Sequence, residues 1–391
     1  MDLSSLVSHP VHFVSDNEEL HRLVNQWMNL KWVALDTEFV RRDTYRAIPA
    51  LIQIFDGQDV WLIDPSSSLD LSIMADLMTA DCIKVLHSAA EDVGVMYQAT
   101  GAWLKNMCDT QLALALLNLG QTVGYQKMIA TILEVEIGKD ETQSDWLVRP
   151  LSEQQIQYAA EDVIYLAHAW EHLEAQLIEK DRLDWLMEDS QQLVDRSRAL
   201  YEMEGDLAFQ RVKGTGRLNS RALAVVRALA IWRERLAAEK NIPKGRILAD
   251  AQIVEIALRK ATNRVVLDQL AVPKGIIRNY GVLIGELVKG AMAIDDAQLP
   301  ERYQLLPKDA KSWLEAVYKP VKQIAAGLNL DPAVLARKKQ FQYLVNKAFR
   351  YQEISAWPED ISGWRRDLIE ESVMESLNAL LDKRAEELSA S

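Results

Sequence analysis

The sequence predicts a mixed α/β domain followed by two all-helical domains. In the first half, short apolar runs of strand length and composition lie between segments of helical pattern. The strand-like runs are residues 32–40, 50–55, 60–63 and 83–87. After about Asp206 these runs stop, and the remaining chain is helical in pattern with breaks at Gly and Pro. We therefore expect domains at residues 1–206, 207–290 and 291–391, a division that 391 residues can support.

The first three strand-like runs are joined by short links, which favours an antiparallel meander. The fourth run is followed by Ser88 and, three residues later, Glu91, the spacing of a capping box. This spacing predicts a helix that begins near residue 88 and carries Asp92 in its first turn.

Two further helices are predicted in the first domain. Asp109 and Thr110 are suited to cap a helix over 111–118. Ser152 and Gln155 form a second capping-box match, at the start of a helical stretch from 153 to about 177. Helices that alternate with strands in this way are typical of a sheet with helices packed on it.

The helical half contains a weak repeat. Residues 241–256 align with residues 329–344 at an offset of 88. The second copy has Asp331, Pro332 and Ala333 where the first has a Pro-Lys-Gly turn at 243–245. Two related helical bundles are the simplest explanation.

Composition narrows the class of protein. Hydrophobic residues make up 49% of the chain, but no apolar stretch approaches the roughly 18 to 20 residues of a membrane span. The N-terminus lacks the pattern of an export signal. Only Cys82 and Cys108 are present, without the spacing of a thiolate zinc site or a disulfide framework. We expect a cytoplasmic protein with no membrane partner.

The net charge of −13 is unevenly distributed. Residues 1–206 hold 14 Lys and Arg against 35 Asp and Glu, a net charge of −21. Residues 207–290 hold 16 against 6, a net charge of +10, and residues 291–391 hold 14 against 16. An acidic body joined to a basic segment fits a chain that binds cations in one part and phosphates in another.

Four acids and a tyrosine form the most informative pattern. Asp36 and Glu38 lie two apart in a predicted strand and so point to one face, and Tyr158 and Asp162 lie four apart in a predicted helix. Taken alone, each pair is typical of an ordinary solvated or core position, and Asp92 is typical of a helix first turn. Their conjunction in one α/β domain favours a site for hard divalent ions, which prefer carboxylate oxygens.

Such a site suits phosphodiester hydrolysis. Two divalent ions can generate a hydroxide nucleophile and stabilise the leaving oxygen. We expect Tyr158 to orient the attacking water first and to act as a base second, because a tyrosine with a pKa near 10 is a poor base at neutral pH.

These motifs resemble a known superfamily. The runs 33–40, 84–92 and 158–163 resemble the three motifs of the DEDD exonucleases, in the branch that carries a tyrosine. The run 145–152 narrows the resemblance to the ribonuclease D family. Residues 211–290, notably 241–248, resemble a helicase-and-ribonuclease-D C-terminal (HRDC) domain, with a degenerate copy at about 295–380.

The resemblance implies a ribonuclease H-like fold and the removal of nucleotides from RNA with a free 3′ end, releasing 5′-monophosphates. It implies 3′ maturation of tRNA precursors as the typical task. It makes Asp36, Glu38, Asp92 and Asp162 the ligands of two Mg²⁺ or Mn²⁺ ions, with Tyr158 at the nucleophilic water. We expect the protein to act as a monomer.

Candidate RNA contacts fall into two groups. Near the acids, the backbone or side chains of Thr37 and Phe39 are candidates for the terminal nucleotide, although Phe39 suits a core position better. Arg149 is the leading candidate there for a phosphate contact, with Arg41, Arg42 and Lys139 as others. In the basic segment the candidates are Arg211, Lys213, Arg217, Arg221, Lys244 and Arg246.

Three alternatives remain open from the residues. The basic segment could dock on the acidic domain instead of binding RNA. The substrate could be DNA, because the same acids serve both polymers and only contacts to the 2′-OH distinguish them. The protein could also be a non-catalytic RNA-binding protein, although the intact set of five residues argues against this.

Overall fold

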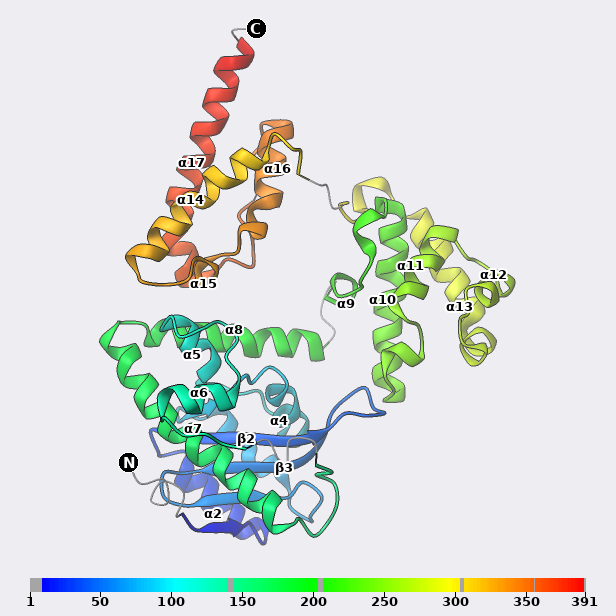
Figure 1. Ribbon diagram of the computed structural model, residues 1–391. Helices are drawn as coiled ribbons and strands as arrows, with labels where there is room; N and C mark the ends of the chain where they lie inside the picture. Colours follow the sequence, from blue (N-terminus) through cyan, green and yellow to red (C-terminus); the bar gives the residue numbers. More distant parts are fainter. Residues whose placement is uncertain (1–8, 139–143, 203–206, 303–305, 355, 390–391) are drawn as a thin grey trace.

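The computed structural model describes residues 9–138, 144–202, 207–302, 306–354 and 356–389. Figure 1 shows a sheet with helices packed around it, formed by the first half of the chain, and two separate groups of helices formed by the second half. The mixed α/β domain and the helical second half are confirmed.

The sheet has six strands in the order β1-β4-β3-β2-β5-β6. The strands are β1 (Val11–Phe13), β2 (Trp32–Val40), β3 (Ile48–Phe55), β4 (Val60–Ile63), β5 (Ile83–Leu86) and β6 (Met107–Asp109). The antiparallel meander of β2, β3 and β4 is confirmed, and β5 pairs with β2 in parallel. The three-residue strands β1 and β6 were not predicted, because neither is long enough to show an alternating pattern.

The central strand β2 is covered on both faces. Ala34 lies in a core cluster with residues of α7 (Glu153–Glu179), whereas Leu35 lies in a second cluster with residues of α2 (Asn17–Trp27). Side chains alternate along a strand, so Asp36 and Glu38 face the α7 side and Thr37 faces the other side. The other helices of this part are α3 (Ala75–Thr79), α4 (Asp92–Thr100), α5 (Thr110–Leu116), α6 (Tyr125–Ile132) and α8 (Leu183–Tyr201).

Two of the three predicted helix starts are confirmed. Ser152 and Gln155 form a reciprocal capping box at α7, and the Asp109 side chain caps α5. The capping box at Ser88 is wrong. Ser88 has a left-handed backbone with φ of 57°, and α4 begins only at Asp92, which is still in the first turn as expected.

The two helical groups carry the predicted repeat. The first group contains α9 (Leu207–Gln210), α10 (Ser220–Lys240), α11 (Asp250–Arg259), α12 (Arg264–Gln269) and α13 (Lys274–Ala293). The second contains α14 (Lys311–Gly327), α15 (Pro332–Leu335), α16 (Gln342–Tyr351) and α17 (Gly363–Ser389).

The repeat is visible at the ends of α10 and α14. Asn241 and Asn329 both adopt left-handed backbone conformations, with φ of 48° and 50°. The next residue in each copy donates its backbone N–H to an alanine carbonyl, Ile242 to Ala237 and Leu330 to Ala325. These pairs keep the offset of 88, so the two copies share one helix-ending geometry. The boundary expected after residue 290 falls inside α13, because nothing interrupts the helix before Ile294.

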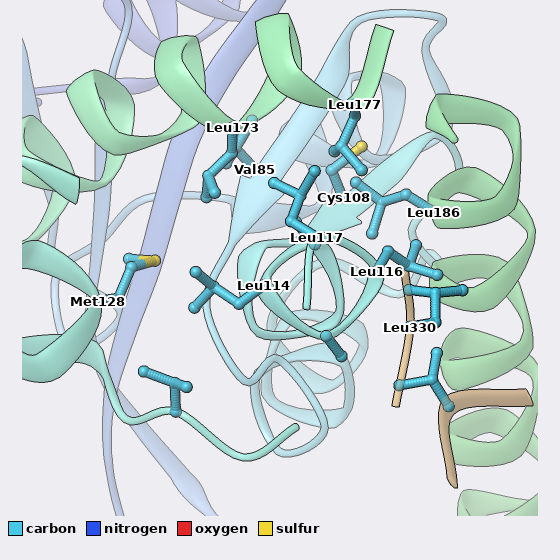
Figure 2. Packing of buried hydrophobic residues seen from close by; sticks show 14 of the residues in the cluster. Val85, Cys108, Leu114, Leu116, Leu117, Met128, Leu173, Leu177, Leu186 and Leu330 are labelled. Atoms are coloured by element: carbon cyan, nitrogen blue, oxygen red, sulfur yellow. The ribbon is translucent and has the colours of Figure 1, made fainter. Parts of the chain in front are cut away.

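The second helical group packs directly on the sheet domain. Leu330 belongs to the same buried cluster as Leu116 and Leu186 (Figure 2). Trp185 and Trp364 stack with ring centroids 4.3 Å apart, and Trp364 donates its indole N–H to Asp189 at 3.0 Å. The sheet domain is therefore held against the C-terminal helices through α8.

Among the residues that the structure describes, no helix has both the length and the apolar character that a membrane span requires.

Candidate active site

Three of the predicted acids meet between β2 and α7. One carboxylate oxygen from each of Asp36, Glu38 and Asp162 lies within 4.8 Å of the other two. The strand aims the first two acids to one face, and α7, which packs on that face, supplies the third. The register of β2 and β3 shifts between Glu38 and Phe39, directly beyond the acids, where the pairing skips Ala50 of β3; such irregularities are common beside active sites.

Asp92 approaches from the other face of β2. It occupies the first position of α4 and is 8% exposed. The Thr37 hydroxyl donates a hydrogen bond of 2.5 Å to its carboxylate. Asp92 lies close enough to raise the pKa values of Asp36 and Glu38 through its charge.

Burial disfavours the ionised forms of all four acids, and the charges of neighbouring members of the set add to this at Asp36 and Glu38. Burial, reinforced by the charges of Asp162 and Asp92, raises the pKa of Glu38 to about 9. Burial and the neighbouring acids also raise the pKa of Asp36 well above its usual range. Burial raises the pKa of Asp162 to about 7 and that of Asp92 to about 6, although hydrogen bonds from Tyr158 and Thr37 oppose these two shifts.

This donor set fits divalent cations. The side chains offer only carboxylate oxygens, and the described residues provide no Lys or Arg ion pair to any of the four acids. A partly buried cluster of acids without a counter-charge is costly, and bound cations would remove that cost. Oxygen ligands select Mg²⁺ or Mn²⁺ over softer metals.

Two tyrosines secure α7 at the site. Tyr158, one helical turn before Asp162, donates its hydroxyl to the Asp162 carboxylate. Tyr125 in α6 donates its hydroxyl to the backbone carbonyl of the same residue. Sequence reasoning missed Tyr125, because no local pattern links it to a helix that begins 28 residues later.

His87 is not a ligand in this arrangement. Its ring nitrogens contact the Thr110 hydroxyl at 2.9 Å and the Val123 carbonyl at 3.1 Å. These contacts hold the segment between β5 and α4 against Thr110 of α5 and against Val123, which precedes α6, so His87 has a structural role.

Two of the predicted RNA contacts are engaged inside the protein. Arg149 donates to both carboxylate oxygens of Asp64, at 2.5 and 2.8 Å, and to the carbonyls of Ala50, Trp146 and Val148. Its guanidinium therefore links several segments of the domain and is not available to phosphate. The Thr37 side chain is likewise turned to Asp92, whereas Phe39 remains half-buried beyond the acids.

A basic cavity of about 560 Å³ is lined by several residues that lie close to the acids in the sequence. Its lining includes Arg41 and Arg42, which follow β2, and Ala90 and Glu91, which precede Asp92. On the helical side it is lined by Arg211, Lys244 and Gly245. The cavity therefore lies between the sheet domain and the first helical group.

The loop between β2 and β3 joins these two parts. The backbone N–H groups of Tyr45 and Arg46 both donate to the Asn241 side chain at 3.2 Å. The Arg46 guanidinium lies over the Tyr201 ring, 4.0 Å from its centroid, and also lines the cavity. Sequence reasoning missed Arg46, although the basic run after the acid strand was a signal for it.

Some of the other basic candidates form ion pairs within the protein, and others are exposed. Lys244 pairs with Glu234 at 2.9 Å, Arg246 pairs with Asp43 of the loop, and Arg221 pairs with Asp296. Arg217 and Arg221 line a separate cavity of about 240 Å³ with Lys260 and Arg302. Arg211 and Lys213 are exposed, and Lys139 lies outside the described residues.

Comparison with known proteins agrees with this geometry. The model of a 3′-5′ exonuclease family matches residues 11–178, an HRDC domain model matches residues 222–288, and a model of the ribonuclease D C-terminal HRDC domain matches residues 309–373. The sheet and its acids thus define a 3′-5′ exonuclease.

Individual relatives narrow the class further. Ribonuclease D of Pseudomonas paraeruginosa is 32% identical over 372 residues, which cover 94% of this chain and 98% of that protein. Ribonuclease D of Haemophilus influenzae is 30% identical over 370 residues, which cover 93% of this chain and 92% of that protein. The chain belongs to the ribonuclease D family, and it is a 3′-5′ exoribonuclease.

Solved structures show the same arrangement. Escherichia coli RNase D, described as an exoribonuclease involved in structured RNA processing, superimposes with a TM-score of 0.81 at 26% identity, covering 94% of this chain and 99% of that chain. The catalytic core of RRP6 from Trypanosoma brucei gives a TM-score of 0.51 at 24% identity, covering 74% of this chain and 82% of that chain, and shares the fold.

Proposed function

We propose that this exoribonuclease removes 3′-terminal nucleotides by two-metal hydrolysis and releases 5′-monophosphates. The observation that carries the proposal is the partly buried cluster of acids without a counter-charge. Asp36, Glu38, Asp92 and Asp162 would hold two Mg²⁺ or Mn²⁺ ions. When bound, such ions lower the pKa of the attacking water and stabilise the leaving oxygen.

The chain's own residues organise the reaction around these acids. Tyr158 already points its hydroxyl at the carboxylate of Asp162, so it is placed to hold the attacking water. Thr37 fixes the carboxylate of Asp92, and Tyr125 fixes the backbone of Asp162. In this assignment Tyr158 orients the nucleophile, and the fixed carboxylates keep the ligand geometry.

The basic cavity is the best-supported path for the RNA strand upstream of its 3′ end. Arg41, Arg42 and Arg46 line it on the exonuclease side, and Arg211 and Lys244 line it on the helical side. Phosphate groups favour such a channel because cations neutralise the backbone regardless of sequence. We assign Phe39 and the backbone of Thr37 to contacts with the terminal nucleotide, and Lys213 and Arg217 are further candidates on the first helical group.

The docking alternative has support of its own. Arg246 pairs with Asp43, and Asn241 accepts two hydrogen bonds from the same loop. Part of the basic segment therefore attaches the helical group to the exonuclease domain. We assign Arg246 to docking and Arg211 to RNA, and we assign Arg221, which pairs with Asp296, to neither.

We further propose that the protein acts in the cytoplasm as a monomer on tRNA precursors. The domain division that we propose is 1–206, 207–293 and 294–391, with the second boundary moved to the end of α13. The family resemblance and the three matched segments support this division.

Digestion of matched oligonucleotides tests the proposal. RNA and DNA of one sequence, with free or blocked 3′ ends, are incubated with Mg²⁺, Mn²⁺ or a chelator, and the products are sized. We expect stepwise shortening of RNA with a free 3′ end, only with metal. Products from a blocked end, or activity in chelator, would refute the mechanism, and equal digestion of DNA would show that the 2′-OH is not recognised.

A further inference from the structure

Gln53 in β3 is a fully buried glutamine whose amide is unused. Its side chain is 0% exposed, and neither Nε2 nor Oε1 finds a hydrogen-bond partner among the described residues. Buried polar atoms are almost always paired, because burial without a partner costs free energy. An apolar side chain would fill this position at lower cost, so the amide requires an explanation.

The strand register places Gln53 beside the acids. Gln53 in β3 is paired directly with Asp36 in β2. Leu51 and Phe55, two residues to either side of Gln53, lie in the cluster that packs on α7. Gln53 therefore faces the same layer as Asp36, and directly opposite residues of an antiparallel pair have Cβ atoms about 4.5–5.5 Å apart.

The acids differ in the donors that hold them. Asp92 accepts from the Thr37 hydroxyl, and Asp162 accepts from Tyr158. Asp36 accepts from the backbone of Thr37, and within the described part of the chain no side chain donates to it. Carboxylates that bind metals are generally oriented by hydrogen bonds from neighbouring residues. Glu38 likewise has no side-chain donor among the described residues, but it lies opposite Leu51, whereas Asp36 lies directly opposite the unused amide of Gln53.

We propose that Gln53 is a positioning residue that orients Asp36 for metal binding. In this assignment its Nε2 would donate to a carboxylate oxygen of Asp36 when the metal is bound. Gln53 itself touches neither metal nor RNA. The inference rests on the metal site proposed above, and it adds a residue from a strand that carries none of the ligands.

The competing explanation is that Gln53 only fills space between the sheet and α7. Met has a similar length and no amide, so Gln53→Met separates the two explanations. Under the filling explanation, Met packs at least as well and metal binding is unchanged. Under the positioning explanation, the metal-free protein is as stable or more stable, but metal binding weakens.

The test uses the full chain and Mn²⁺, whose free concentration is measured by electron paramagnetic resonance, together with thermal melts with and without Mn²⁺. We expect Gln53→Met to keep or raise the melting temperature without metal and to weaken Mn²⁺ binding about 10- to 100-fold. Gln53→Leu is measured in parallel. Ile54→Met is the matched control, because it introduces the same side chain one residue away on the opposite face of β3.

Each other outcome counts against a specific claim. If Gln53→Met binds Mn²⁺ within about twofold of the wild type while Asp36→Asn loses binding, the positioning role is wrong and the metal site stands. If both Gln53 variants lower the metal-free melting temperature more than Ile54→Met does, Gln53 is structural and the inference is again wrong. If Asp36→Asn binds Mn²⁺ as well as the wild type does, the proposed metal site itself fails.

Discussion

Thr37 and Asp92 meet on the face of the acid-bearing strand that is opposite to Asp36 and Glu38. The Thr37 hydroxyl donates to the Asp92 carboxylate at 2.5 Å, and both side chains are less than a tenth exposed. The residue between Asp36 and Glu38 thus holds the first turn of α4 in place. Sequence reasoning assigned Thr37 to the terminal nucleotide, whereas the geometry makes its side chain an orienting group for the fourth acid.

This relationship predicts the behaviour of Thr37→Val. The change keeps the shape of the side chain and removes the donor, so Asp92 loses its fixed orientation. We expect kcat to fall about 10- to 100-fold with KM for RNA changed less than twofold, and Thr37→Ser to retain activity. Steady-state digestion of a short RNA measures both constants. A raised KM with unchanged kcat would instead support contact between the Thr37 side chain and RNA.

The acid cluster predicts how the stability of the metal-free protein depends on pH. Burial and mutual repulsion raise the pKa of Glu38 to about 9 and burial raises that of Asp162 to about 7, whereas unfolded carboxyls titrate near 4. Between about pH 4 and 9 the folded state therefore binds more protons than the unfolded state. It follows that the cluster's contribution to the free energy of unfolding falls as pH rises through this window.

The measurement compares wild type with Asp36→Asn in chelator at pH 5 and pH 8. From pH 5 to pH 8 we expect the melting temperature of the wild type to fall further than that of the variant. The difference should be about 2–4 °C for each kcal/mol of repulsion that the variant relieves. Added Mn²⁺ should raise the melting temperature of the wild type, and more at pH 8 than at pH 5 because protons compete with the ion. Parallel pH profiles of the two proteins would mean that the acids do not repel one another as their positions imply.

Tyr158→Phe tests the division of labour on α7. The phenol contacts the Asp162 carboxylate, but phenylalanine leaves all four acids in place. We expect kcat to fall about 10²- to 10⁴-fold, as for loss of a group that positions or deprotonates the nucleophile, with Mn²⁺ affinity changed less than threefold. An equal loss of rate and of Mn²⁺ affinity would show that the tyrosine organises the ligands instead.

The features that the sequence predicted correctly are local ones. The bounds of β2 and β4 match because their apolar runs end at polar or turn residues, and the Ser152 capping box is complete within four residues. The helix-ending asparagines of the repeat are equally local. Asp36 and Glu38 could be paired from the sequence because a strand alone fixes their common face.

The features that were missed depend on distant partners. The N–H groups of Ser88 and Ala89 both donate to the Asp109 carboxylate, so Ser88 does not cap α4. Arg149 forms an ion pair with Asp64, which lies 85 residues earlier in the sequence. From the sequence alone, Gln53 is an ordinary polar residue in a strand, and only the sheet register shows that it lies opposite Asp36. None of these relationships leaves a pattern within a short window of sequence.

Arg149→Met tests the structural assignment of that residue. The change leaves the Asp64 carboxylate and several carbonyls without their donor in a half-buried position. We expect the free energy of unfolding to fall by about 1–3 kcal/mol, measured by urea denaturation. RNA affinity in the folded protein should stay within about twofold. A loss of RNA affinity without a loss of stability would show that Arg149 contacts phosphate, as expected from the sequence.

The basic cavity predicts how RNA affinity depends on salt. Arg42 and Arg211 line it from opposite sides, one from the exonuclease loop and one from the helical group, and both are exposed. If a single strand runs between them, replacing either with Ala removes one phosphate contact. We expect each change to weaken binding and to reduce the slope of log K against log salt by about 0.7.

Arg278→Ala is the control, because Arg278 is an exposed residue of the same helical group outside the cavity lining, and this change should leave the slope unchanged. If the basic segment only docks on the acidic domain, Arg211→Ala will lower the melting temperature and Arg42→Ala will not alter the slope.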